Sequence, residues 1–393
     1  MDSGCDSDSD SDSRGGTEGH PIRGASATRI RDALETRDPF PGTAGFAGWI
    51  DDALVRDVLG RVPLFVEEPV LEGDVSLAPD RVAFSPESLA APVLVPAGSR
   101  LGPSGLERIW SLPEIDVSES GVDGRDDATA IDAVDDAIAT AIDAVDARNV
   151  AVAFSGGVDS ALVAELLDAP LYVVGFQDSH DVEAARTAAE AMGRDLTVVS
   201  LEPSDLERAT PAVARAIGRT NAMDVQIALP LYLVAERIAA DGFDAMAVGQ
   251  GADELFGGYE KVVHLDHRVE AETVRGAVRE QIETLPAQLP RDVLAAEAAG
   301  VSPVAPLLHD AVVEAALALP PHLLADEDER KRALRAVASR YLPDSVARRE
   351  KKAVQYGSLV ARELDRLARQ AGYKRRMDDH VTRYVSSLLS SDS

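Results

Sequence analysis

The chain has 393 residues, 45% of them hydrophobic, which is enough for one large or two ordinary domains with a packed core. It has no run of 18 apolar residues and no basic flank followed by an apolar leader, so we expect a cytoplasmic protein that does not span a membrane. Its single cysteine, Cys5, excludes a disulfide framework and argues against a cysteine-based zinc site.

The charge balance is strongly acidic, with 39 Lys and Arg against 68 Asp and Glu and a net charge of −29. Only five of the basic residues are lysine. This composition is typical of halophilic proteins, whose acidic surfaces stay hydrated in dense salt. We interpret the acidity as host adaptation. The lack of a basic stripe also argues against a nucleic-acid partner.

The N-terminal third of the chain shows three changes of composition. Residues 1–25 are acidic and rich in Ser and Gly, which predicts a disordered tail. Residues 26–115 contain short β-like runs broken by Pro, Gly and Asp, and residues 116–127 are expected to form a polar linker. A helix is predicted over 128–147, where apolar residues recur every three or four positions.

From residue 149 the chain alternates between apolar strands and helices. The predicted strands are "NVAVAF", "PLYVVGF", "DLTVVSL" and "FDAMAVG", and helical segments stand between them. Such alternation predicts an α/β fold, a doubly wound parallel sheet with helices on both faces. After residue 262 the chain is expected to be mainly helical, and residues 381–393 to be a tail.

The first candidate site is "SGGVDS", which lies where a strand ends and a helix begins. Gly156 and Gly157 leave room for backbone N–H groups to close on an anion, and Ser155 and Ser160 add hydroxyl donors. The helix N-terminus favours negative charge. Asp159 would repel a bare phosphate, so the arrangement predicts a divalent cation as well.

Two simpler interpretations of this loop stay open on the residues alone. A Gly-Gly pair between a strand and a helix can serve only as a connection. The loop could also be a degenerate Walker loop, although the required Gly-Lys-Ser/Thr is missing.

The second candidate site is "AVGQGADELFGGYEK", residues 247–261, which again follows a predicted strand. Its glycines indicate a loop that lets another group approach closely, and Asp253 lies in the middle of it. Carboxylates from two strand ends can share one metal ion with pyrophosphate.

The first loop resembles the Ser-Gly-Gly-x-Asp-Ser signature of PP-loop ATP pyrophosphatases. The second resembles the Gly-x-Gly-Ser/Ala-Asp-Glu-x-Phe-Gly-Gly-Tyr motif of asparagine synthetases. The resemblance implies cleavage of ATP between its α- and β-phosphates, with Mg²⁺ on Asp159 and Asp253. It also implies that Lys351 neutralises charge on the reacting phosphates. The nucleotide-binding positions that it implies are Ala153, Ser155, Gly156, Gly157, Val158, Asp159, Ser160, Val174, Gly249 and Gly251.

The resemblance extends to most of the chain after about residue 60. It implies that 128–380 form an asparagine synthetase-like ATP-binding domain and that 26–115 are a truncated remnant of a glutaminase domain. The glutaminase of this family needs a cysteine exposed after Met1 is removed, and Asp2 stands there instead. We therefore expect no glutaminase activity from this chain, and ammonia that is free or delivered by a separate glutaminase.

A second departure concerns the nitrogen nucleophile. The family usually has Glu, a proposed base for the attacking ammonia, where this chain has Gln250. A glutamine side chain cannot take a proton at neutral pH.

The expected function is an ATP-dependent carbon–nitrogen ligase that adenylates a small carboxylate, with aspartate as the first candidate, and transfers it to ammonia or an amine. Two alternatives stay open. One is another PP-loop reaction, such as tRNA or metabolite modification. The other is a non-catalytic nucleotide-binding partner subunit.

Overall fold

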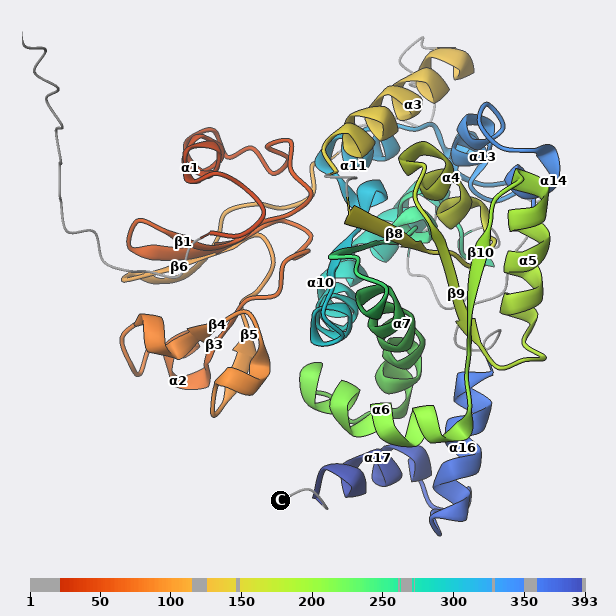
Figure 1. Ribbon diagram of the computed structural model, residues 1–393. Coiled ribbons are helices and arrows are strands. Elements are labelled where there is room, and N and C mark those ends of the chain that lie inside the picture. Colours follow the sequence, from red (N-terminus) through yellow and green to blue (C-terminus); the bar gives the residue numbers. More distant parts are fainter. Residues whose placement is uncertain are drawn as a thin grey trace, which may run out of the picture.

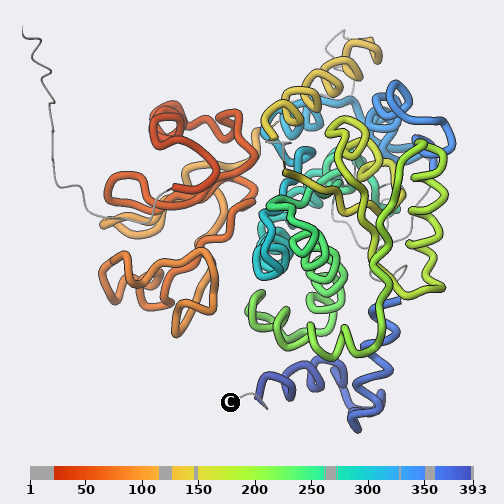
Figure 2. The backbone as a smooth tube through the Cα atoms, viewed as in Figure 1, coloured from red at the N-terminus to blue at the C-terminus, as the bar shows by residue number. Residues whose placement is uncertain are grey.

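The computed structural model describes residues 22–114, 126–145, 149–260, 262, 271, 273–326, 329–349 and 359–390 (Figure 1). Residues 22–114 lie to one side as a β-rich unit, coloured red to orange (Figure 2). The remaining described residues are built around a parallel sheet (Figure 1). Among the described residues, no helix combines the length and apolarity needed to cross a bilayer.

The central sheet has five parallel strands in the order β10-β9-β8-β11-β12. The chain therefore builds outward from β8 to β10 and then returns to add two strands on the other side. This is the doubly wound topology that the alternating pattern predicts. The strands are β8 (Val150–Ala153), β9 (Leu171–Gly175), β10 (Leu196–Ser200), β11 (Ala245–Ala247) and β12 (Ser302–Val304).

Strand β12 is a feature that the sequence analysis did not predict. It lies at the edge of the sheet and pairs only with β11 among the described strands. Pro303 is in its middle, which an edge strand tolerates because one side of the backbone needs no ladder partner. Three residues with a central proline carry too little periodicity to indicate a strand in advance.

Helices cover both faces of this sheet and form two separate cores. Successive side chains of β8 and β9 point to opposite faces, as the strand period requires. Val152 and Val173 thus join the core made with α3 (Asp127–Asp143), α4 (Val158–Leu167), α5 (His180–Met192), α11 (Asp310–Leu317) and α13 (Arg332–Ala338). Ala151 and Val174 join the core made with α6 (Pro203–Ala216), α7 (Ala222–Ala240) and α16 (Val360–Gln370), and α10 (Val274–Ala298) contributes to both cores. Figure 1 shows α4 and α5 on one side of the sheet and α6 and α7 on the other.

The helices around the sheet vary in length from one turn to seven. Several begin at the polar residue expected of a helix start; Ser179, for example, accepts a hydrogen bond from the Val182 N–H at the start of α5. Their bounds are α3 (Asp127–Asp143), α4 (Val158–Leu167), α5 (His180–Met192), α6 (Pro203–Ala216), α7 (Ala222–Ala240), α8 (Ala252–Leu255), α10 (Val274–Ala298), α11 (Asp310–Leu317), α12 (Pro321–Leu324), α13 (Arg332–Ala338), α14 (Asp344–Ala347), α16 (Val360–Gln370) and α17 (His380–Ser390).

Residues 22–114 form two small antiparallel sheets and two helices. One sheet has the order β1-β2-β6-β7 and the other β4-β3-β5. Their bounds are α1 (Ala27–Thr36), β1 (Ala47–Ile50), β2 (Ala53–Arg56), β3 (Phe65–Glu67), α2 (Glu68–Leu71), β4 (Val82–Ala83), β5 (Pro92–Leu94), β6 (Ser99–Gly102) and β7 (Gly105–Arg108).

A buried ion pair joins this β-rich unit to the rest of the chain. The Arg61 guanidinium contacts Asp57 at 2.8 Å and Asp310 at 2.7 Å, and all three side chains are at most 4% exposed. Arg61 also donates to the Leu308 carbonyl at 2.7 Å, and the Thr43 N–H and hydroxyl donate to Asp310. The segment that leads into α11 is therefore held by residues from the N-terminal unit.

Candidate functional site

The two glycine-rich loops meet at the point where the sheet changes its direction of winding. Strands β8 and β11 are neighbours in the sheet, and residues 154–160 and 248–253 follow their carboxyl ends. In doubly wound sheets, ligands bind in the crevice outside the strands at this switch point. The predicted site residues from two distant segments are thus brought to one edge.

The first loop is fixed by its own serines and by a close backbone approach. The Ser160 hydroxyl accepts from the Ser155 N–H at 3.2 Å and lies 3.1 Å from the Ser155 hydroxyl. Gly156 has φ +72°, and a Cβ there would lie 2.7 Å from the Ala184 carbonyl oxygen. Gly157 caps the start of α4. A side chain at Gly156 would therefore displace the loop from α5.

The second loop packs directly against the first. A Cβ on Gly249 would lie 2.7 Å from the Ser160 nitrogen and 2.8 Å from the Asp159 Cβ. Gly251 has φ +93° and lies against the Leu308 side chain. The glycines of this loop are needed because the loop passes between α4 and the segment held by Arg61.

The two predicted metal-binding carboxylates share one cation, the ammonium of Lys331. Its Nζ is 2.7 Å from Asp159 Oδ2 and 2.7 Å from Asp253 Oδ1. The Lys331 and Asp159 side chains are 8% and 14% exposed, and Asp253 is 46% exposed. Burial alone would lower the pKa of Lys331, but the two carboxylates hold this pKa above its ordinary value.

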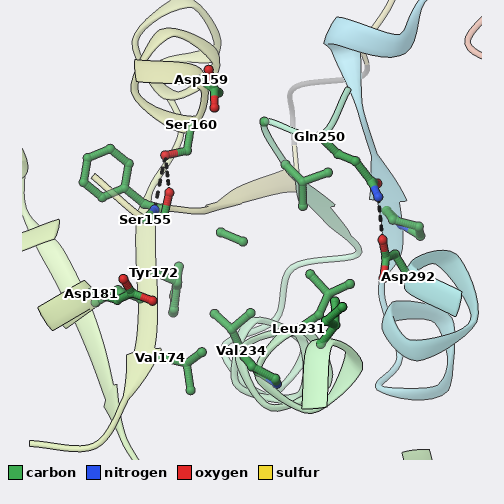
Figure 3. Close-up of a pocket in the computed structure, with 18 of the residues that line it drawn as sticks. Ser155, Asp159, Ser160, Tyr172, Val174, Asp181, Leu231, Val234, Gln250 and Asp292 are labelled. Atoms are coloured by element: carbon green, nitrogen blue, oxygen red, sulfur yellow. Dashed lines mark hydrogen bonds between the residues drawn. The ribbon is translucent and has the colours of Figure 1, made fainter. Parts of the chain in front are cut away.

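A cavity of about 280 Å³ opens beside these residues. Ser155, Asp159 and Ser160 lie at its polar end, and α7 lines its apolar end (Figure 3). Asp253, which shares Lys331 with Asp159, also lines the cavity. Val174 and Asp181 lie on one wall, and Gln250 and Asp292 lie on the other (Figure 3). The other lining residues are Ala153, Phe154, Tyr172, Val173, Ile227, Pro230, Leu231, Val234, Val248, Gly249 and Pro303. This mixture of an apolar body and a few polar groups suits a small organic ligand with a charged part.

Gln250 occupies a defined position in this wall. Its Nε2 donates to Asp292 Oδ2 at 2.5 Å (Figure 3). Asp292 also accepts from Arg291 Nε at 2.7 Å, and Arg291 reaches Asp224 at 3.0 Å. Burial alone would lower the pKa of Arg291, but Asp292 and Asp224 hold it above its ordinary value.

Most of the predicted site residues line the cavity, and a few do not. Ala153, Ser155, Asp159, Ser160, Val174, Gly249, Gln250 and Asp253 are in the wall. Gly156, Gly157, Val158 and Gly251 shape the loops behind it, and Val158 is 3% exposed in the core. Lys351 lies outside the described residues.

Sequence reasoning missed Lys331, Asp292 and the apolar side chains of α7. Lys331 is 172 residues from Asp159 in the chain, so no local pattern connects them. One signal was available: lysine is scarce in this chain, and Lys331 is one of only two in the described residues, with Lys374. No corresponding signal singled out Asp292 among 68 acidic residues.

The donor set at the loops fits a magnesium ion bound together with phosphate. Within the residues that the structure describes, no group of three or more His, Cys, Asp and Glu side chains is placed to hold a metal by itself. Magnesium takes one or two carboxylates and completes its octahedron with water and phosphate oxygens. Asp159 and Asp253 already converge on one cation, which is what such a site requires.

The fold and this edge of the sheet define an α/β protein of the doubly wound class with a ligand cavity at the switch point. A family model described as asparagine synthase matches residues 131–284 and 266–383, so it covers more than half of the chain. The chain belongs to the asparagine synthase family.

Similar proteins carry the same name. The chain is 30% identical over 279 residues to a protein of Methanocaldococcus jannaschii named "Putative asparagine synthetase [glutamine-hydrolyzing] 1", covering 61% of this chain and 52% of that protein. It is 26% identical over 219 residues to an asparagine synthetase [glutamine-hydrolyzing] of Asparagus officinalis, covering 52% of this chain and 37% of the relative. The matches therefore span about half or less of those relatives.

Proposed function

We propose that the chain is an ATP-dependent ligase that adenylates a small carboxylate, with aspartate as the first candidate, and transfers the acyl group to ammonia or an amine. The observation that carries the proposal is the convergence of Asp159 and Asp253 on one cation beside a glycine-rich loop, in a member of this family. The named activity of the relatives supports the same reaction class.

In the proposed first step, the adenine lies against Val174 and the phosphates lie over the loop from Ser155 to Ser160. A substrate carboxylate oxygen attacks the α-phosphorus. The new O–P bond replaces the bond to the bridging oxygen, and pyrophosphate leaves. Loop N–H groups, serine hydroxyls and the start of α4 stabilise the departing negative charge. Magnesium on Asp159 and Asp253 would neutralise charge on the phosphates.

Two lysines are assigned to the phosphates in this proposal. The Lys331 ammonium lies between the Asp159 and Asp253 carboxylates. In this proposal a metal ion takes the position of the ammonium, and the lysine side chain turns toward pyrophosphate. Lys351 is assigned to the reacting phosphates on sequence alone, since it lies outside the described residues. A lysine acts there as a point charge.

In the proposed second step, a nitrogen nucleophile attacks the carbonyl carbon of the acyl adenylate. A C–N bond forms, the C–O bond to AMP breaks, and one proton is lost from the nitrogen. We propose free ammonia, or ammonia from a separate glutaminase, as the nitrogen source.

The test is ATP–pyrophosphate exchange in high KCl with Mg²⁺, assayed separately with aspartate, glutamate and a cell metabolite extract. Asp159→Asn is expected to abolish exchange. Asp51→Asn, which removes an exposed carboxylate paired with Arg31 in the N-terminal unit, is the charge-matched control and should leave exchange unchanged.

Exchange with aspartate would support aspartyl adenylation, and exchange with the extract alone would point to another carboxylate. Absence of exchange under all conditions, with ATP still bound, would reject the proposal and favour a non-catalytic nucleotide-binding subunit. Amide formation from ammonium chloride, compared with glutamine, then tests the nitrogen source.

A further inference from the structure

The Gln250–Asp292 pair forms the cavity wall opposite the proposed adenine position. Gln250 follows β11, and Asp292 comes from the interior of α10, 42 residues later. Both line the cavity, and Figure 3 shows them opposite Val174 and Asp181. A nucleotide with its base at Val174 and its phosphates at the first loop leaves this wall to the acyl group and its attacker.

Asp292 is held firmly in this wall. The residue is 8% exposed, and it receives Arg291 Nε on Oδ1 at 2.7 Å and Arg291 Nη2 on Oδ2 at 3.0 Å. Arg291 is anchored in turn by Asp224 at the start of α7, which also accepts from Arg219 and Asn221. Two hydrogen bonds from one planar guanidinium fix the orientation of the carboxylate that accepts them.

The other carboxylates of the cavity have different positions or partners. Among the described lining residues, Asp159 and Asp253 contact Lys331 beside the first loop, and Asp181 lies on the opposite wall with Val174. Asp292 is therefore the carboxylate on the same wall as Gln250. Gln250 cannot take a proton, but its amide donates to Asp292 and keeps its own carbonyl oxygen as an acceptor.

We propose, on the basis of the proposed function, that Asp292 is a catalytic residue that accepts the proton of the attacking nitrogen, and that Gln250 orients the Asp292 carboxylate. The nitrogen lone pair forms the C–N bond, the C–O bond to AMP breaks, and the proton passes from the nitrogen to the Asp292 carboxylate and then to solvent. The carboxylate that the family usually places in the second loop is thus supplied here from α10.

The experiment compares two nitrogen nucleophiles in Asp292→Asn and in the unaltered protein. Ammonium must lose a proton before and during attack, whereas hydroxylamine is largely uncharged and strongly nucleophilic at neutral pH. General-base catalysis typically contributes about 10²- to 10⁴-fold, so amide formation from ammonia should fall roughly 100-fold or more. Hydroxamate formation should fall much less, and ATP–pyrophosphate exchange should stay within about threefold.

Two control variants separate proton transfer from structure. Asp365→Asn removes a carboxylate that pairs with Arg375 and His380 outside the cavity lining, and it should lower thermal stability while leaving the ratio of the ammonia and hydroxylamine rates unchanged. Adding Gln250→Glu to Asp292→Asn returns a carboxylate to this wall, and it should recover part of the ammonia-dependent rate.

Equal losses with both nucleophiles, or an unchanged ammonia rate in Asp292→Asn, would overturn the assignment of Asp292 while exchange in the unaltered protein still supports the proposed function. Absence of exchange in the unaltered protein would overturn both. If Asp292→Asn does not fold, Asp292→Glu, which moves the carboxylate by one methylene, replaces it in the experiment. Asp292→Glu should slow amide formation from ammonia more than it slows ATP–pyrophosphate exchange, and equal effects on the two rates would reject the assignment.

Discussion

Replacing Lys331 by methionine tests whether its ammonium occupies the position of the proposed metal. Methionine keeps most of the buried aliphatic stem and removes the charge between Asp159 and Asp253. Both carboxylate oxygens are 2.7 Å from the same nitrogen, so without it they would face each other at roughly 5 Å or less. With an effective dielectric constant of about 20, their repulsion is about 3 kcal/mol.

The expected loss of stability is smaller than this repulsion, because Asp253 is 46% exposed and water screens it. We expect Lys331→Met to lower the free energy of unfolding by about 2 kcal/mol, or Tm by roughly 4 °C. Mg²⁺ added without ATP should raise the Tm of the variant. The Mg²⁺ concentration needed should be lower for the variant than for the unaltered protein, because no ammonium competes with the metal ion.

The assay is thermal unfolding in moderate KCl, with and without Mg²⁺. Lys374→Met is the matched control, since Lys374 is exposed and does not line the cavity. It should change neither Tm nor the response to Mg²⁺. If Lys331→Met has an unchanged Tm, or if Mg²⁺ raises the Tm of both proteins equally, the shared-cation reasoning is wrong.

Three further predictions concern residues around the site. Burial holds the pKa of His309 below its ordinary value, so the unfolded chain binds its proton first and stability should fall as pH drops below about 6.5. His309→Asn keeps an acceptor for the Ala311 N–H at the start of α11 and should flatten that slope in denaturant titrations at several pH values. Arg61→Met leaves Asp310 buried and partly unpaired and should cost about 3 to 5 kcal/mol in urea unfolding; a loss under 1 kcal/mol would contradict this. Gly249→Ala should separate the two loops, abolishing pyrophosphate exchange and lowering stability by about 1 to 3 kcal/mol.

The sheet could be predicted from the sequence because each long strand carries its own signal. Apolar, β-branched runs such as Val150–Ala153 and Leu171–Gly175 are buried on both faces, which makes them continuously hydrophobic. The glycine loops could be placed at the switch point because each follows one of the predicted parallel strands. Strand β12 could not, because three residues around Pro303 give no periodic pattern.

The candidate site was predictable only where its residues are close in sequence. Ser155, Asp159 and Ser160 occur within six positions, so their spacing alone indicates a loop and a helix start. Asp292 reaches the cavity through the packing of α10, and Lys331, at the start of α13, contacts two carboxylates of the cavity wall. Tertiary contacts of that kind cannot be recognised within a short window of sequence. The scarcity of lysine was a signal for Lys331, but it does not indicate where in the fold that residue lies.

The junction at Arg61 has a consequence for how the protein responds to its medium. In molar salt the Debye length shrinks to about 3 Å, and exposed pairs such as Arg31–Asp51 lose most of their attraction. The Arg61 and Asp310 side chains are 4% and 0% exposed, so dissolved ions cannot come between them. The contact that holds the segment beside Gly251 should therefore depend less on ionic strength than the exposed ion pairs do.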